Sequence, residues 1–128
     1  MRVIDSSVIV KCASKEEGWQ KADSFLDDAA TIDLAIKELG NALWKKIRKN
    51  EIALDEAREI ISDYRHSFKM LNQAEYFDGA IKIAVEHNIS FYDSIFLASA
   101  LAEGLELVTC DKKQADSAKT MGIPSILL

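Results

Sequence analysis

RVIDSSVIV at residues 2 to 10 decides the fold, because a short buried strand runs through an acid, Asp5, into a segment that this acid can cap as a helix. ELVTCD at residues 106 to 111 also ends a predicted strand in an acid, and a helix-like segment follows it. PSILL at residues 124 to 128 is predicted to be another buried strand, and ATIDLA at residues 30 to 35 is a weaker candidate. These segments favour a sheet of short strands.

Apolar and small residues recur at helical spacing between the predicted strands. Short strands that alternate with helices predict a three-layer α/β/α fold, with a central, mostly parallel sheet of four to five short strands. A single proline and the absence of a linker-like stretch favour one domain over residues 1 to 128. The helical sets are Ile36, Leu39, Leu43, Trp44 and Ile47; Ala80, Ile83 and Ala84; and Ile95, Phe96, Ser99 and Ala102.

The composition is that of a globular protein, with 48% hydrophobic and 29% charged residues. No apolar run approaches the roughly 18 residues that span a bilayer, and no signal peptide precedes the first strand, so we expect no membrane anchor. Cys12 and Cys110 show no C-x-x-C spacing, which argues against a disulfide framework or a zinc site and for a cytoplasmic setting. His66 and His87 fit no metal-binding pattern.

Three acids that are distant in the sequence are predicted to meet at one edge of the sheet. Asp5 and Asp111 close strands, and Asp93 opens a helix. In a parallel sheet, ligands bind at the edge where the carboxyl ends of the strands lie. Glu38, near the start of its own helix, can point to the same edge, and Thr109 can lie on the same side of its strand as Asp111 because strand side chains alternate.

Helix capping is the alternative explanation for each acid taken alone. Asp5 and Asp111 suit N-cap positions, and Ser90 with Asp93 matches the S-x-x-[DE] pattern of a capping box. Glu38 could favour a helix N-terminus through the macrodipole. Convergence of all four acids at one edge favours a functional site instead.

Four segments, taken together and in this order, resemble the PIN domain and most closely its VapC-type toxin ribonucleases. The resemblance covers residues 3 to 128 and implies a metal-dependent endoribonuclease, the toxin of a toxin-antitoxin pair. It implies that Asp5, Glu38, Asp93 and Asp111 bind metal, assisted by Thr109 and by Ser6 or Ser7. We also expect Ser6 and Ser7 to bind substrate. The segments are VIDSSV at 3 to 8, KELGNALWK at 37 to 45, ISFYDSIFLASA at 89 to 100 and LVTCDKK at 107 to 113.

Oxygen ligands of this kind suit Mg²⁺ or Mn²⁺. We expect Asp5 and Asp93 to be direct ligands, Glu38 and Asp111 to act partly through water, and Thr109 to orient them. With no lysine or arginine expected between the acids, mutual repulsion should raise the pKa of at least one of them.

The segment behind Asp111 departs from the family pattern. Relatives are expected to place a further acid there, whereas Lys112 and Lys113 follow here and Asp116 lies farther along. We therefore expect one or two metal ions, with the second held weakly.

The formal net charge of −5 opposes binding of RNA over the whole surface, so basic residues that bind substrate must be local. Lys45, Arg48 and Lys49 fall on one predicted helix face and could hold RNA phosphates. A solvated helix face explains them equally well. Lys11 and Lys15 add positive charge near Asp5.

RNA, a second copy of the chain and a small antitoxin protein are the partners that the resemblance implies. Trp19, Phe25 and Tyr64 are apolar residues that a core of this size can leave uncovered, which also favours a homodimer. A housekeeping RNA-processing PIN nuclease is the alternative within the same resemblance.

Two alternatives come from other classes of protein. A phosphoacceptor receiver domain should show an acidic pair after its first strand and a lysine before its late proline, but Ser6 follows Asp5 and Ile123 precedes Pro124. The D-x-D motif of aspartate-nucleophile phosphatases is also missing. A non-catalytic α/β module that binds a basic partner through its acidic edge stays open.

Overall fold

Five parallel strands form one sheet in the computed structural model, which describes all residues from 1 to 128. Their order across the sheet is β3-β2-β1-β4-β5, and every neighbouring pair is parallel. This confirms the predicted fold class. The strands are β1 (Arg2–Ile4), β2 (Ala29–Ile32), β3 (Lys69–Leu71), β4 (Glu106–Thr109) and β5 (Ser125–Leu127).

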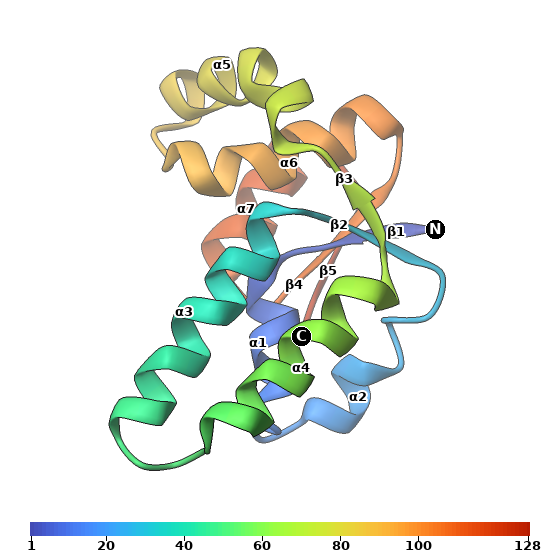
Figure 1. The fold of residues 1–128 in the computed structure, drawn as a ribbon. Helices are drawn as coiled ribbons and strands as arrows, with labels where there is room; N and C mark the ends of the chain where they lie inside the picture. The colour runs from blue at the N-terminus through green and yellow to red at the C-terminus, as the bar shows by residue number, and fades with distance from the viewer.

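Helices cover both faces of the sheet (Figure 1). The first four α-helices lie on one face of the sheet and the last two lie on the other, which gives the three predicted layers. The α-helix Phe77–His87 packs against the helix Phe91–Glu103. None of the helices combines the length and apolar character that crossing a bilayer would require. They are α1 (Ser6–Ala13), α2 (Trp19–Asp23), α3 (Leu34–Arg48), α4 (Leu54–Ser67), the 3-10 helix η1 (Gln73–Tyr76), α5 (Phe77–His87), α6 (Phe91–Glu103) and α7 (Lys112–Thr120).

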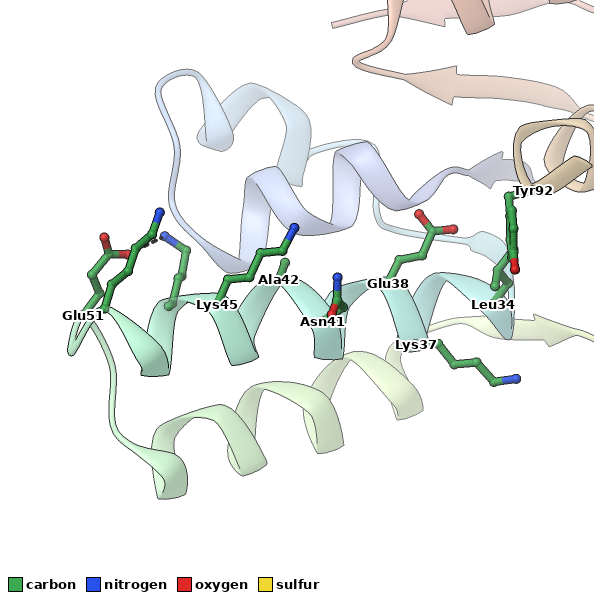
Figure 2. Close-up of a pocket in the computed structure, with 10 residues that line it drawn as sticks. Leu34, Lys37, Glu38, Asn41, Ala42, Lys45, Glu51 and Tyr92 are labelled. Atoms are coloured by element: carbon green, nitrogen blue, oxygen red, sulfur yellow. Dashed lines mark hydrogen bonds and ion pairs between the residues drawn. The ribbon is translucent and has the colours of Figure 1, made fainter. Parts of the chain in front are cut away.

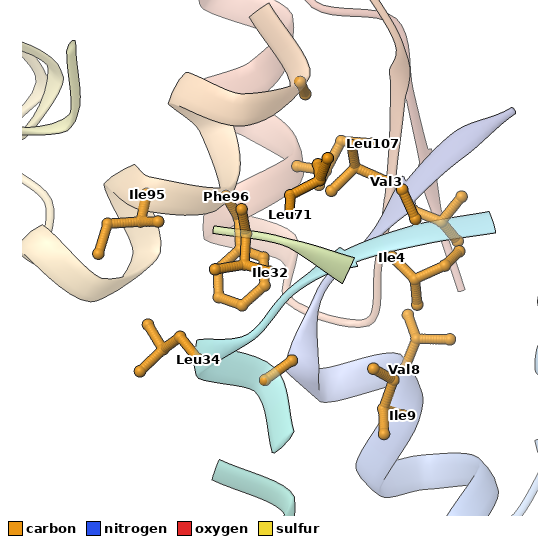
Figure 3. Packing of buried hydrophobic residues seen from close by; sticks show 14 of the residues in the cluster. Val3, Ile4, Val8, Ile9, Ile32, Leu34, Leu71, Ile95, Phe96 and Leu107 are labelled. Atoms are coloured by element: carbon orange, nitrogen blue, oxygen red, sulfur yellow. The ribbon is translucent and has the colours of Figure 1, made fainter. Parts of the chain in front are cut away.

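The core lies on both faces of the sheet (Figure 3): α6 packs against β1, β2 and β4 on one face, and buried residues of α1 and α3, among them Val8 and Ile9, lie on the other. Every residue of α6 from Ser94 to Ala100 is buried, and Phe96 is the largest side chain among them. The small residues in this stretch let the helix lie close to the strands. Truncating Phe96 to alanine would cost about 3–5 kcal/mol through lost burial and the cavity left behind.

The ends of α6 follow directly from its sequence. Ser90 caps the N-terminus by accepting a hydrogen bond of 3.1 Å from the N–H of Asp93. Gly104 ends the helix at a φ of 65°, a left-handed conformation that favours glycine. The first turn of α6, which carries Asp93, is therefore held at a defined place.

The core leaves several apolar side chains partly or largely uncovered. Trp19, Phe25 and Tyr64 are half-buried, as the sequence indicated. The exposed apolar residues include a stripe along α5, made by Phe77, Ile81 and Val85. We call these three residues the α5 stripe; their spacing of four places them on one helix face.

The direction in which the chain builds the sheet reverses between β1 and β4. β2 and β3 lie on one side of β1, and β4 and β5 lie on its other side. Ligand sites in open α/β sheets lie at such a reversal, outside the carboxyl ends of the strands. The order also differs from the 2-1-3-4-5 order of flavodoxin-like receiver domains, so the receiver alternative is wrong.

Candidate active site

A cavity of about 450 Å³ opens at the carboxyl ends of β1 and β4. All four predicted acids line it: Asp5 follows β1, Asp111 follows β4, Glu38 lies on α3 and Asp93 lies on α6. Segments as distant as residues 5 and 111 thus meet at one place, as expected from the topology. We call this space the carboxylate cavity.

Asp5 is the most deeply placed of these acids, with only 5% of its surface exposed. It caps α1 by accepting a hydrogen bond from the N–H of Ser7, 3.1 Å away. Burial raises the pKa of Asp5 to about 6, although hydrogen bonds from Ser7 and Thr109 lower it in part. The expected rise in pKa is present, but its leading cause is burial and not repulsion between acids.

Two hydroxyl groups hold the carboxylate of Asp5. The hydroxyl of Ser7 donates to Oδ1, and the hydroxyl of Thr109 donates to Oδ2. Each hydroxyl oxygen also accepts a main-chain N–H, from Cys110 at 2.9 Å for Ser7 and from Asp111 at 3.0 Å for Thr109. Because these N–H groups occupy the acceptor side, the hydroxyl protons are directed to Asp5.

Glu38 lies in the second turn of α3, whose first turn contains no acid, so the macrodipole explanation for Glu38 is wrong. The hydroxyl of Ser6 donates to Glu38 Oε2 at 2.8 Å. Burial raises the pKa of Glu38, and the negative charge of Asp93 raises it further. The hydroxyl protons of both Ser6 and Ser7 therefore go to carboxylates, and these serines position acids rather than offer donors to a substrate.

Asp93 keeps its carboxylate free. Its N–H is used in the cap made by Ser90, but its carboxylate takes part in no hydrogen bond or ion pair with the rest of the protein. The capping explanation therefore accounts for Ser90 and not for the acid. Asp93 is exposed and faces the cavity.

Asp111 both caps a helix and lines the carboxylate cavity. Its Oδ1 accepts hydrogen bonds from the N–H groups of Lys113 and Gln114, at 2.9 and 3.3 Å, and so caps α7. It also lines the cavity. Asp116, in contrast, forms an ion pair of 2.9 Å with Lys112 at the surface and does not line the cavity.

Two contributors to the site, Glu16 and Gln114, escaped the sequence analysis. Glu16 lines the carboxylate cavity, and so does Lys11, whose positive charge was expected near Asp5, so a lysine does lie beside the acids. Gln114 is buried in the first turn of α7, and its side-chain amide donates a hydrogen bond of 3.0 Å to the main-chain oxygen of Asp93. A polar residue spaced four positions from the buried Ala118 is the signal that could have identified Gln114.

A second cavity, of about 670 Å³, continues from Glu38 along α3 (Figure 2). Lys45 and Lys49, two of the three basic residues expected to share a helix face, line it. Arg48 does not, because its guanidinium lies over the ring of Trp44, 5.0 Å from the ring centroid. We call this cavity the lysine groove; it is lined by Leu34, Lys37, Glu38, Asn41, Ala42, Lys45, Lys46, Lys49, Glu51 and Tyr92.

The family model of the PIN domain matches residues 2–119. The chain belongs to the PIN domain family. Ribonuclease VapC3 of Pyrobaculum aerophilum is 30% identical over 128 residues, which cover 95% of this chain and 98% of that protein. Exonuclease VapC9 of the same organism is 33% identical over 120 residues, which cover 94% of this chain and 86% of that protein. These matches confirm the resemblance read from four segments.

Solved structures of similar proteins agree with this assignment. A crystal structure from Pyrobaculum aerophilum superposes with a TM-score of 0.76 at 30% identity, over 97% of this chain and 82% of the other. A toxin-antitoxin complex from Klebsiella pneumoniae gives a TM-score of 0.64 at 18% identity, over 89% of each chain. The second likeness shows that the fold is shared.

PIN-domain nucleases generally use divalent metal ions, and the donor set of this cavity fits such ions. Its acids offer oxygen, the ligand that hard divalent cations prefer. No three acidic, histidine or cysteine side chains already enclose an ion-sized space. Mg²⁺ typically keeps several waters and takes only one or two direct carboxylates, so an open cavity lined by free acids such as Asp93 is compatible with it.

Proposed function

We propose that this PIN-domain protein is a VapC-type toxin, an endoribonuclease that hydrolyses phosphodiester bonds of RNA with the help of Mg²⁺ or Mn²⁺. The observation that carries the proposal is the convergence of Asp5, Glu38, Asp93 and Asp111 on one cavity at the reversal point of the sheet. The names of both relatives, a ribonuclease and an exonuclease, support nuclease activity. Their shared name VapC favours a toxin over a housekeeping nuclease.

The four acids divide the work of holding the ion. Asp93, exposed and free of other bonds, and Asp5 would be direct ligands, and Glu38 and Asp111 would hold the ion's water shell. When bound, the ion supplies Lewis acidity toward water and phosphate oxygens. Thr109 and Ser7 keep Asp5 in one orientation, so the cavity does not have to reorganise its deepest ligand when substrate arrives.

Glu38 is the residue best placed to take the proton of the attacking water. Its pKa is raised, and Ser6 occupies only one of its two oxygens. A base works best when its pKa lies closer to the working pH than that of a free carboxylate. Glu38 also lines both cavities, so it stands where the lysine groove meets the acids.

The lysine groove provides local positive charge for RNA binding, although the chain as a whole is negatively charged. Between Leu34 and Lys49 the chain carries five basic residues and one acid, although the whole chain has a net charge of −5. Positive charge is therefore concentrated along α3, where Lys45 and Lys49 can bind phosphates that lead to the carboxylate cavity.

A small antitoxin protein and a second copy of the chain are the proposed protein partners. The toxin-antitoxin complex that shares this fold supports the first. The α5 stripe supports the second, because it leaves three large apolar side chains exposed on one helix face. These two proposals about protein partners do not depend on the chemistry of the carboxylate cavity.

Cleavage of a circular RNA tests the activity, since only an endonuclease can open a molecule without ends. The purified protein should open it with Mg²⁺ or Mn²⁺ and not with EDTA. Asp93→Asn should abolish cleavage, whereas Asp116→Asn, which changes an exposed acid outside the cavity, should leave it intact. Requirement for a free RNA end would make the protein an exonuclease, and binding without cleavage would favour the non-catalytic module.

A further inference from the structure

Tyr92 stands at the boundary between the two cavities. Its side chain lines the lysine groove, and the next residue, Asp93, lines the carboxylate cavity. Figure 2 shows Tyr92 at the same end of α3 as Glu38, which the two cavities share. Tyr92 and Glu38 therefore lie together at the end of the lysine groove that adjoins the carboxylate cavity.

The ring of Tyr92 is left uncovered although its helix turn is firmly anchored. Tyr92 is 63% exposed. On one side of it Phe91 packs against Phe77, with 5.5 Å between the ring centroids. On the other side Ser94 is fully buried and donates a hydrogen bond of 2.7 Å to the main-chain oxygen of Ser90. A fixed backbone thus presents an aromatic side chain whose surface is mostly uncovered.

The lysines of the groove are available for an anionic ligand. Lys46 is paired with Glu51 at 3.4 Å, but Lys45 and Lys49 have no carboxylate within ion-pair distance. The helix rises about 6 Å from Lys45 to Lys49 and about 10 Å from Glu38 to Lys45, so the two lysines lie together at the end of the groove away from the acids. Charge complementarity therefore favours the backbone of a nucleic acid as the occupant of the groove.

We propose that Tyr92 stacks on the base of the nucleotide beside the bond that is cut. The inference rests on the proposed function and assigns a base-binding residue to its site. An aromatic side chain can stack on a base only when that base is free of a duplex stack, and proteins that bind single strands combine such rings with a basic path. The lysine groove provides the basic path, and the exposed ring of Tyr92 lines the same groove.

Cleavage kinetics with Mn²⁺ test the stacking. The substrates are single-stranded RNAs in which one nucleotide at a time carries no base, and the same sequence paired as a duplex. Loss of the stacked base should weaken kcat/KM of the wild-type protein about 5- to 150-fold, mainly through KM. Tyr92→Leu should show this loss on the intact strand and no further loss on the abasic one. Fluorescence of 2-aminopurine at that position should be quenched by the wild type and not by Tyr92→Leu.

Two variants make the result specific. Tyr92→Phe keeps the ring and should restore both the quenching and KM. Trp44→Leu removes another exposed aromatic ring of the chain, on α3 but outside both cavities, and should behave as wild type. An equal abasic penalty in wild type and Tyr92→Leu, or equal cleavage of single strand and duplex, would overturn the inference while leaving the ribonuclease in place. Absence of cleavage of every RNA by the wild type would instead defeat the proposed function and this inference with it.

Discussion

Gln114 donates a hydrogen bond of 3.0 Å from its side-chain amide to the main-chain oxygen of Asp93, and so joins the first turn of α7 to the first turn of α6. Its own N–H also contributes to the cap that Asp111 makes. With 3% of its surface exposed, Gln114 has little freedom to move. One residue that touches no substrate thus links two of the four acids.

Gln114→Leu should lower kcat about tenfold while KM stays nearly constant, because groups that orient metal ligands typically contribute 10- to 100-fold. The variant keeps the buried volume but leaves the oxygen of Asp93 without its donor. Initial rates at several Mn²⁺ concentrations would measure the effect, and circular dichroism would show that the fold persists. A variant with the kcat of wild type would show that Gln114 is only a packing residue.

Burial of Asp5 makes the metal-free protein sensitive to pH. The folded-state pKa of Asp5 is about 6, and its ordinary value is 3.8. Between these values the folded protein binds more protons than the unfolded chain, so the free energy of unfolding falls as pH rises from about 4 to 6. The loss from this group is about 3 kcal/mol and is complete above that window.

Asp5→Asn should therefore be more stable than wild type at pH 8 in EDTA, and the gain should shrink at pH 4, where Asp5 is protonated. Urea unfolding at both pH values measures this. Asp111→Asn is the matched control, because Asp111 is an exposed cap and asparagine caps a helix equally well. If Asp5→Asn were the less stable protein at pH 8, burial of the charge would not be the dominant cost.

Convergence of the acids was predictable because topology alone brings the carboxyl ends of parallel strands together. Asp5 and Asp111 each end a strand, and this is visible in the sequence. The edge strand β3 was missed, since it has three residues and only Leu71 is fully buried. Tyr64 was expected on a helix, but the periodic set of α4 was not identified, although Ala57, Ile60 and Tyr64 follow helical spacing.

The burial of the site residues and their hydrogen-bond partners could not be predicted from the sequence. The contact between Thr109 and Asp5 joins residues 104 positions apart, and neither the burial of Asp5 nor its pKa follows from spacing. Lys11 was expected near Asp5, but its place in the cavity wall could not be predicted, because it depends on how α1 lies against the sheet. Arg48 shares a predicted face with Lys45 but lies over Trp44 instead, a choice made by side-chain packing.

Millimolar Mn²⁺ should raise the melting temperature of the wild-type protein, because a ligand that binds only the folded state stabilises it by mass action. At a hundred times the dissociation constant the stabilisation is about 2.7 kcal/mol. Asp93→Asn should lose most of this shift, and Asp116→Asn should keep it. Identical melting temperatures with Mn²⁺ and with EDTA would contradict a metal site at the carboxylate cavity.

The α5 stripe should hold two copies of the chain together. Light scattering at micromolar concentration should give about twice the chain mass of 14.3 kDa for the wild type. Ile81→Asp puts a charge at the centre of the stripe and should yield the single chain, since an unpaired charge in an apolar interface is costly. Leu54→Asp, at another exposed apolar residue, is the control. A dimer that survives Ile81→Asp would place the interface elsewhere.

Lys45 and Lys49 should control how strongly RNA binding depends on salt. Each lysine that contacts a phosphate of a single strand releases bound counterions and steepens the salt dependence of the binding constant by about 0.7 on a double-logarithmic scale. The double variant with both lysines changed to alanine should therefore bind more weakly at low salt and show a slope smaller by about 1.4.

Arg48→Ala, on the same helix but outside the groove, should keep the slope of wild type. Anisotropy of a labelled single-stranded RNA between 50 and 200 mM salt, about the range over which such contacts are felt, would measure all three proteins. If Arg48→Ala changed the slope and the double lysine variant did not, the phosphates would follow the Trp44 face of α3, and the path into the carboxylate cavity proposed from the lysine groove would be wrong.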